Sequence, residues 1–298
     1  MRSNNVLGFI FAATLDDKIP ELASSRTTAS IPIGGKYRII DFDLSNMSNS
    51  GISNVGIVAK SNFQSLMDHV GSGSAYDLSK RRSNLSILPP YDGKAFSSFV
   101  ETIYNMHGYI EHCREEYVLI SQGNVITNID YTDVFDFHSK KKADITLIYK
   151  NHAIPQGYDR PITLDVDNDG KVNQIFVKPG VVDKGVFNHA YGSILIKKDL
   201  LMSEIRNAIS VNQLDVKRLL QSSLGKYSIY AYENKGYCAA ISSINDYFEF
   251  NMDLMKKEVR DELFNPQRPI YTKVRDDAPS RFPTTDALAI IRDVLQLK

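Results

Sequence analysis

A glycine pair followed by two cations is the feature of this sequence best suited to chemistry. Gly34 and Gly35 stand directly before Lys36, and Arg38 follows two residues later. Glycine allows a positive φ or a close approach of the backbone to a ligand, and the two cations offer charge to an anion. The spacing therefore predicts a phosphate-binding turn. A Gly-Gly turn before a helix with a basic surface fits the same residues, and this alternative stays open.

A second candidate region follows residues 117–121, an apolar run with the length of a buried strand. Residues 122–131 would then lie at the carboxyl end of that strand. Ligands bind at the carboxyl ends of strands in open α/β sheets, so this segment is expected to contribute to a site.

The composition limits the possible classes of protein. With 298 residues and 43% apolar side chains, the chain can form a large domain with a substantial core. The charges of thirty-five basic and thirty-five acidic residues cancel. A net charge of zero argues against nucleic acid or an anionic membrane as a binding partner. The early apolar run at residues 6–13 is too short to span a bilayer. Cys113 and Cys238 stand far apart and fit reduced thiols, so we expect a cytoplasmic protein.

Alternating apolar runs and amphipathic stretches indicate how the candidate residues are positioned. Residues 6–13 and 55–59 are typical of buried strands, and residues 43–50 and 97–114 of helices between strands. This alternation predicts an α/β fold with a mixed, mostly parallel sheet and helices on both faces. Residues 71–90, rich in Gly, Ser and Arg, are expected to form a long surface loop.

The second half of the chain is richer in strand and turn patterns. A turn signal at residues 167–170 predicts a hairpin. Asp165, Asp167 and Asp169 also match the first half of a calcium loop, but Phe176 stands where that loop requires a bidentate glutamate, so no calcium site is expected. A nicotinamide-binding fingerprint is missing after the first predicted strand. Further predicted elements are helices at residues 198–209, 215–222 and 244–257, a short β segment at residues 268–274 and a helical pattern at residues 283–298.

Residues 34–52 read GGKYRIIDFDLSNMSNSGI, and Gly123-Asn124 and Phe176-Val177-Lys178-Pro179 follow in order. Together these motifs resemble the sugar-nucleotide pyrophosphorylases, and within them the glucose-1-phosphate adenylyltransferases. The resemblance implies a Rossmann-like, GT-A-like nucleotidyltransferase domain, expected at residues 1–262. It also implies a left-handed β-helix, of which residues 263–298 would be a linker and a truncated remnant. The implied family reaction converts ATP and glucose 1-phosphate to ADP-glucose and diphosphate, with Mg²⁺ as cofactor.

The nucleotide side of the family's site is altered in three places. Residues 13–18 correspond to the family's Gly-x-Gly-x-Arg loop, but they contain two carboxylates and no glycine. Arg26 is retained from the family's Arg-Ala-Lys-Pro, whereas Thr28 replaces the lysine. Residues 98–101 correspond to the family's Gly-Thr-Ala-Asp motif beside the adenine. Phe99 in this segment would crowd the adenine pocket. The resemblance therefore implies impaired nucleotide binding.

Both metal-binding carboxylates of the family are replaced. Asn124 corresponds to the aspartate of its Gly-Asp motif, and Ala240 to the aspartate of its later Trp-Arg-Asp motif. An amide and a methyl group leave little to hold Mg²⁺ against water. Losing the charge stabilisation that a metal supplies costs roughly several kcal/mol of barrier. The resemblance thus implies no intact catalytic residue, no bound metal and little or no activity of the chain alone.

Cations that the family uses for phosphates are retained. Lys178 matches the lysine that binds the phosphate of glucose 1-phosphate, although Val177 replaces the glutamate before it. Lys36 and Arg38 match cations around the family's activator site, and Arg26 is a further phosphate candidate. A sugar phosphate is therefore the expected effector, while surface cations flanking a turn remain the structural alternative.

A retained scaffold with lost carboxylates resembles the GlgD-type subunits of glycogen biosynthesis. The resemblance implies a regulatory, non-catalytic subunit that forms a hetero-oligomer with a catalytic adenylyltransferase subunit. Two alternatives stay open. The chain could be an active nucleotidyltransferase with atypical metal ligands such as Asp130 or Asp246. It could also be a sugar-phosphate-binding module that uses Lys36, Arg38 and Lys178.

Overall fold

Strand β1 (Val6–Phe11) lies in the interior of the computed structural model, with all six of its residues buried. Its side chains alternate between two cores. Phe9 and Phe11 pack on one face of the sheet, whereas Val6 and Ile10 pack on the other. Because helices cover both faces, the strand is apolar along its whole length. The predicted buried strand is confirmed.

The structure describes residues 3–12, 16–59, 62–79, 84–89, 98–153, 161–177 and 185–274. Within them, the central sheet has nine strands. Besides β1 they are β4 (Asn54–Val58), β5 (Asn84–Leu88), β6 (Tyr117–Ser121), β8 (Ile145–Ala153), β9 (Ile162–Val166), β10 (Val172–Val177), β11 (Val186–Lys197) and β12 (Ile229–Glu233).

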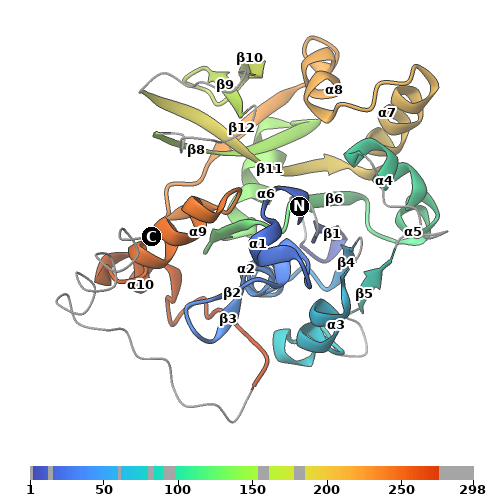
Figure 1. Ribbon diagram of the computed structural model, residues 1–298. Coiled ribbons are helices and arrows are strands. Elements are labelled where there is room, and N and C mark those ends of the chain that lie inside the picture. Colours follow the sequence, from blue (N-terminus) through green and yellow to red (C-terminus); the bar gives the residue numbers. More distant parts are fainter. Residues whose placement is uncertain are drawn as a thin grey trace.

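One long strand joins two parallel blocks of this sheet (Figure 1). Strands β6, β1, β4 and β5 run parallel to one another, and β12 runs parallel to β8. β11 pairs antiparallel with β6 on one side and with β8 on the other, so it couples the two blocks. The predicted hairpin is formed by β9 and β10. The predicted mixed α/β fold is confirmed.

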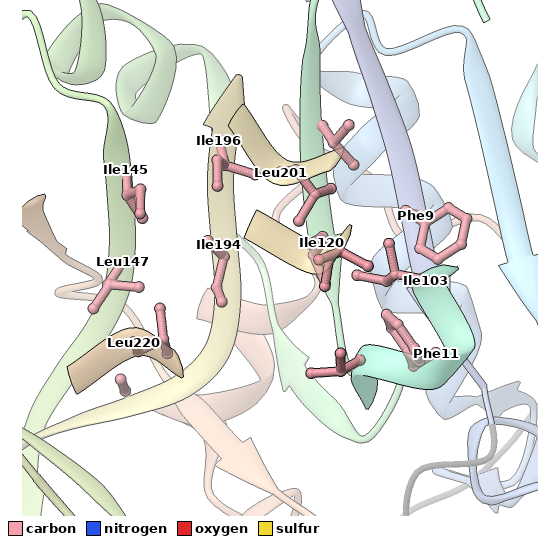
Figure 2. Packing of buried hydrophobic residues seen from close by; sticks show 14 of the residues in the cluster. Phe9, Phe11, Ile103, Ile120, Ile145, Leu147, Ile194, Ile196, Leu201 and Leu220 are labelled. Carbon is pink, nitrogen blue, oxygen red and sulfur yellow. The ribbon is translucent and has the colours of Figure 1, made fainter. Parts of the chain in front are cut away.

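Helices cover both faces of the sheet. On the face of Phe9, shown in Figure 2, lie α4 (Phe99–Asn105), α5 (His107–His112), α7 (Lys198–Ser210) and α8 (Val216–Ser223). The opposite face is covered by α2 (Ile39–Asn49), α3 (Gln64–Val70) and α6 (Tyr131–Lys141). A third cluster, around Phe42, contains residues of α9 (Ile244–Asp253), α10 (Lys257–Leu263) and the short α1 (Pro20–Ala23). Two small sheets pair β2 (Pro32–Ile33) with β3 (Tyr37–Arg38), and β7 (Val125–Thr127) with β13 (Cys238–Ala240).

The β2–β3 hairpin leads directly into α2. Gly34 and Gly35 at its tip have φ values of +55° and +72°, which glycine adopts without strain. The N–H of Arg38 donates a hydrogen bond of 2.9 Å to Asp41 Oδ2, which caps the first turn of the helix. The Gly-Gly turn is therefore confirmed. The helix begins earlier than predicted because Ile39 already belongs to its buried first turn.

Polar side chains of α2 bind backbone groups that regular secondary structure leaves unpaired. Asn46 Nδ2 donates to the carbonyl of Thr127 at 2.8 Å, close to the end of β7. Asn49 Nδ2 donates to the carbonyl of Pro269 at 3.0 Å. Pro269 belongs to residues 265–274, which run past this helix without strand pairing. The Asn/Ser-rich part of the motif thus has a structural role, which is clearest for the buried Asn46–Thr127 bond because backbone groups removed from water need partners.

The prediction of a loop at residues 71–90 is wrong in part, because β5 lies within it as an edge strand. It pairs in parallel register with β4, so that Asn54 stands opposite Asn84. Leu85 and Ile87 pack partly against the core on the face of α2. The strand is short, and the Gly, Ser and Arg residues around it obscure its pattern.

Three other predicted elements differ in their bounds. The helix predicted at residues 97–114 is described as α4 and α5, separated at Met106 with φ −91° and ψ 7°. The helix predicted at residues 244–257 is divided into α9 and α10. Residues 268–274 form no strand, because side chains rather than a neighbouring strand bind their backbone. The pattern at residues 283–298 lies outside the described residues.

Replacing Phe9 with alanine should lower the free energy of unfolding by about 3–5 kcal/mol, because the ring is fully buried and its removal leaves a cavity. Urea denaturation of the purified chain measures the change. Val211→Ala is the matched control, since Val211 is 72% exposed, and it should change stability by less than about 0.5 kcal/mol. Equal effects of the two substitutions would contradict the described core.

Candidate functional site

Asn124 and Ala240, where the resemblance places the metal carboxylates, lie side by side. β7 and β13 pair antiparallel with Ala240 opposite Val125. Beyond this pair, the N–H of Ile241 donates to the carbonyl of Asn124 at 2.9 Å. Asn124 follows the carboxyl end of β6, the edge at which α/β sheets bind ligands. The fold thus brings together two positions that are far apart in the sequence.

The amide of Asn124 is bound to the protein itself. The residue is 1% exposed, and its Nδ2 donates to the carbonyl of Ile241 at 3.2 Å. Its Oδ1 has no hydrogen-bond partner within the described residues. Ala240 adds only a methyl group. A neutral amide at one position and a methyl group at the other do not fit a resident Mg²⁺ ion, which requires anionic oxygen ligands.

The alternative metal ligands have other partners. Asp130 Oδ2 forms an ion pair with Arg268 at 2.6 Å, and its Oδ1 caps α6 by accepting from the N–H of Thr132. Asp246, at the start of α9, accepts from the N–H of Ser242 at 3.0 Å. In the part of the chain that the structure describes, no three His, Cys, Asp or Glu side chains are grouped so as to hold a metal ion.

Aromatic rings fill the side of the site expected for adenine. Phe99, at the start of α4, stacks on Phe11 with ring centroids 4.7 Å apart and an interplanar angle of 23°. Phe11 ends β1, and a Cβ atom at Gly123 would lie 2.5 Å from its carbonyl oxygen. This close approach explains why the chain keeps the family's glycine there. The carboxyl end of β1 is therefore packed by the protein's own residues.

Two departures from the family form one hydrogen-bonded pair. Asp16 Oδ1 accepts from the N–H of Thr28 at 2.7 Å and from its Oγ1 at 2.6 Å. Thr28 is 1% exposed and Asp16 is half-buried, so the pair lies just below the surface. A carboxylate is thereby held in the loop where the resemblance places a triphosphate, and like charges repel.

Tyr191 and two histidines occupy the space next to Ala240. Tyr191 packs in one buried cluster with Val125 and Ala240. Its hydroxyl lies 2.5 Å from His152 Nε2, and that nitrogen lies 3.3 Å from His189 Nδ1. Burial lowers the pKa of His152 to about 4 and that of His189 to about 3, so both imidazoles are neutral at pH 7. His189 and Tyr191 belong to β11 and His152 to β8, so the three rings come from two neighbouring strands.

The predicted phosphate-binding cations are used differently. Lys36 is exposed at the hairpin, with Nζ 5.8 Å from the centroid of the Tyr37 ring. Arg38 binds the protein, since its Nη1 donates to the carbonyl and the hydroxyl of Ser65 at 2.6 and 2.7 Å. Arg26 is half-buried in the segment before Thr28. Lys178 lies outside the described residues.

Sequence reasoning missed a buried carboxylate beneath the hairpin. Asp41 Oδ1 accepts from His69 Nε2 at 2.6 Å and from the hydroxyl of Tyr76 at 2.5 Å. Its Oδ2 accepts from the N–H of Arg38 at 2.9 Å. These bonds tie the end of the hairpin to α3 and to the turn that follows it. An acidic residue inside the apolar run Ile-Ile-Asp-Phe was the available signal.

A second buried acid, Asp43, also lies on α2. Its Oδ1 accepts from Ser121 Oγ at 2.6 Å, while its Oδ2 has no hydrogen-bond partner among the described residues. Burial raises the pKa of this carboxyl to about 7, against the lowering effect of the Ser121 hydrogen bond. Ser121 ends β6, so a group that titrates near neutral pH lies close to the segment carrying Asn124.

Comparison with known proteins agrees with this arrangement. The sequence pattern of the family described as Nucleotidyl transferase matches residues 17–257. The chain belongs to the nucleotidyl transferase family. A glucose-1-phosphate adenylyltransferase from Clostridium acetobutylicum is 30% identical over 282 residues, which are 91% of this chain and 73% of that protein. The glycogen biosynthesis protein GlgD of Bacillus subtilis is 28% identical over 286 residues, 95% of this chain and 73% of the relative.

A solved structure shows that the nucleotidyl transferase fold is shared more widely. A Bacillus anthracis protein, provisionally assigned as a glucose-1-phosphate thymidylyltransferase, aligns with a TM-score of 0.68 at 13% identity. The alignment covers 88% of this chain and 98% of that one. Identity this low supports the fold alone. None of the helices in the described ranges is long and apolar enough to cross a membrane.

The buried Asp43 should make stability fall as pH rises. Its folded pKa of about 7 lies above the unfolded value of about 3.9, so folding favours the protonated acid. This stabilisation is complete below about pH 4 and is lost as pH rises to 7. Asp43→Asn should remove that slope and raise the free energy of unfolding at pH 8 by about 1–4 kcal/mol. Urea denaturation between pH 4 and 8 measures it.

The exposed Asp133→Asn is the control for the Asp43 experiment. This variant should keep the slope of the parent chain. If Asp43→Asn also keeps the slope, Asp43 is not the group responsible.

Proposed function

We propose that this chain is a non-catalytic, regulatory subunit of glucose-1-phosphate adenylyltransferase in glycogen biosynthesis. The observation that carries the proposal is the juxtaposition of Asn124 and Ala240, neither of which supplies a carboxylate. Transfer of an adenylyl group from ATP places negative charge on phosphate oxygens, which a divalent metal stabilises in such reactions. Without anionic ligands for that metal, most of the rate enhancement is lost.

The nucleotide side supports the same conclusion independently of the metal. The Asp16–Thr28 pair puts a carboxylate where the triphosphate would bind, and the Phe11–Phe99 stack fills the side expected for adenine. In each case the substituted residue, Thr28 or Phe99, is held in place by a second residue of the protein, Asp16 or Phe11. Binding of ATP would have to break both contacts.

The expected effector is a sugar phosphate at the hairpin. Lys36 is exposed there and makes no ion pair with any residue the structure describes. Arg38 fixes the base of the hairpin through Ser65, so we assign it a positioning role. Lys178 remains a candidate for contact with the phosphate of glucose 1-phosphate. A sugar-phosphate-binding module that acts without a partner is the second candidate function, favoured by the same exposed lysine.

The proposed partner is a catalytic adenylyltransferase subunit, with which the chain forms a cytoplasmic hetero-oligomer. Similarity to both a glucose-1-phosphate adenylyltransferase and a GlgD protein supports a role in glycogen biosynthesis. An active enzyme with atypical ligands is less well supported, since Asp130 is paired with Arg268 and Asp246 with the N–H of Ser242.

Restoring the carboxylates tests the absence of catalysis. The purified chain should form ADP-glucose at least about 1,000-fold more slowly than a catalytic subunit assayed beside it. Asn124→Asp with Ala240→Asp should restore weak binding of Mg²⁺, measured by calorimetry. Activity should rise further when Thr28→Lys and Phe99→Thr are added, because these changes open the nucleotide side. Asn207→Asp, at an exposed position of α7, controls for added charge.

Comparable turnover by the unmodified chain would overturn the non-catalytic assignment, provided that Asn124→Ala abolishes it. In that case the Asn124 oxygen would be serving as a metal ligand.

Co-expression with the catalytic adenylyltransferase of the same source tests the regulatory role. The two chains should co-purify, and the maximal rate or the sugar-phosphate response of the catalytic subunit should change by about twofold or more. Lys36→Gln should weaken the response to sugar phosphate without affecting co-purification, whereas the exposed Lys226→Gln should leave both unchanged. Failure to co-purify would exclude the subunit role.

A further inference from the structure

A groove of about 760 Å³ lies beside the edge strand β5, away from the candidate site. Asn54 and Asn84, the first residues of β4 and β5, line it together with residues of α4 and α5. β4, β5 and β6 are parallel, and Asn124 follows the carboxyl end of β6. The amino ends of β4 and β5 therefore lie at the opposite end of the strands from Asn124. Figure 1 shows β5 at the end of the sheet near α5.

The groove has an apolar wall. Leu88 from β5, Met106 between the two helices and Tyr109 from α5 form it. Leu88 and Tyr109 are each only partly buried, so part of this apolar surface faces the groove. The volume lies within the range of about 300–1,000 Å³ that is typical of small-molecule sites.

The rim carries positive charge at Arg114. The guanidinium of Arg114 is exposed and makes no hydrogen bond or ion pair with any described residue. His107 and His112 each donate from Nδ1 to a backbone carbonyl, at 2.7 and 2.5 Å, which leaves their Nε2 atoms available. The carboxylate lining the groove, Glu115, already accepts from Asn54 Nδ2 at 3.1 Å.

Asn54 also lines the groove. Its Oδ1 is removed from solvent and has no hydrogen-bond partner among the described residues, which is unfavourable for an amide oxygen. The groove therefore combines an apolar wall with a guanidinium whose planar fork matches phosphate oxygens.

We propose that this groove binds a small organic phosphate. Its apolar body lies against Leu88, Met106 and Tyr109, and its phosphate pairs with Arg114 at the rim. The site is distinct from the hairpin cation Lys36, which does not line the groove. This inference goes beyond the proposed subunit role and does not depend on it.

Calorimetry with 1-naphthyl phosphate tests the proposal, with 1-naphthol and inorganic phosphate as the two halves of the probe. The intact probe should bind at least about tenfold more tightly than either half, because only it engages both the wall and Arg114. Arg114→Gln should weaken binding of the probe about tenfold. Asn105→Trp should block the groove from an exposed position without disturbing the core. Lys36→Gln should have no effect.

Alkylation of the two cysteines gives a second readout. Cys113 lines the groove, whereas Cys238 lies in β13 and does not line it. The probe should slow iodoacetamide labelling of Cys113 several-fold, as followed by mass spectrometry, and leave Cys238 unchanged.

Three results would overturn the proposal. They are no saturable binding up to about 1 mM, binding that survives both Arg114→Gln and Asn105→Trp, and binding lost in Lys36→Gln, which would place the ligand at the hairpin. Only the loss of binding in Lys36→Gln bears on the proposed function, and this result would support an effector site at the hairpin. Thermal melts and circular dichroism of each variant establish that a loss of binding is not a loss of folding.

Discussion

Backbone groups that leave water must find hydrogen-bond partners, and α2 supplies these partners for two irregular segments. Asn46 binds the carbonyl of Thr127 next to the segment that carries Asn124. Ser45 Oγ accepts from the N–H of Tyr271 at 2.8 Å, and Asn49 binds the carbonyl of Pro269. The same helix buries its apolar side chains against the sheet. Its sequence is therefore constrained twice, by packing and by hydrogen bonding, whether or not the chain is a catalyst.

This constraint explains how the frame can persist while residues around it are substituted. The residues that depart from the family are not simply missing ligands, because several of them contact other side chains of the protein. Thr28 binds Asp16, Phe99 stacks on Phe11, and Tyr191 meets His152. A substrate pocket is polar, hydrated space, and filling it with mutually satisfied side chains removes a source of instability. The site described here is thus a packed region built on the scaffold of a binding site.

The two acids of α2 show how local surroundings decide the behaviour of identical groups. Asp41 accepts hydrogen bonds from His69, Tyr76 and the N–H of Arg38. Asp43, two residues further on, accepts from Ser121 and has one oxygen without a partner among the described residues. Burial of Asp43 is only partly compensated by hydrogen bonds, and it raises the pKa of this carboxyl to about 7.

The sequence alone determined those features that depend on neighbouring residues. The apolar run of β1, the positive φ values at Gly34 and Gly35 and the hairpin of β9 and β10 follow from local pattern and turn chemistry. The family resemblance, carried by contiguous motifs, also selected Asn124 and Ala240 as positions of interest.

Only the tertiary structure decided what depends on residues distant in the chain. β5 is a strand because β4 lies beside it, and Asn124 meets Ala240 because β7 pairs with β13. The burial of Asp43 and the partnership of Asp16 with Thr28 are likewise invisible in the sequence. Hydrogen bonding, burial and electrostatics act through space, so a residue's chemistry is set by partners that the fold supplies rather than by its neighbours in sequence.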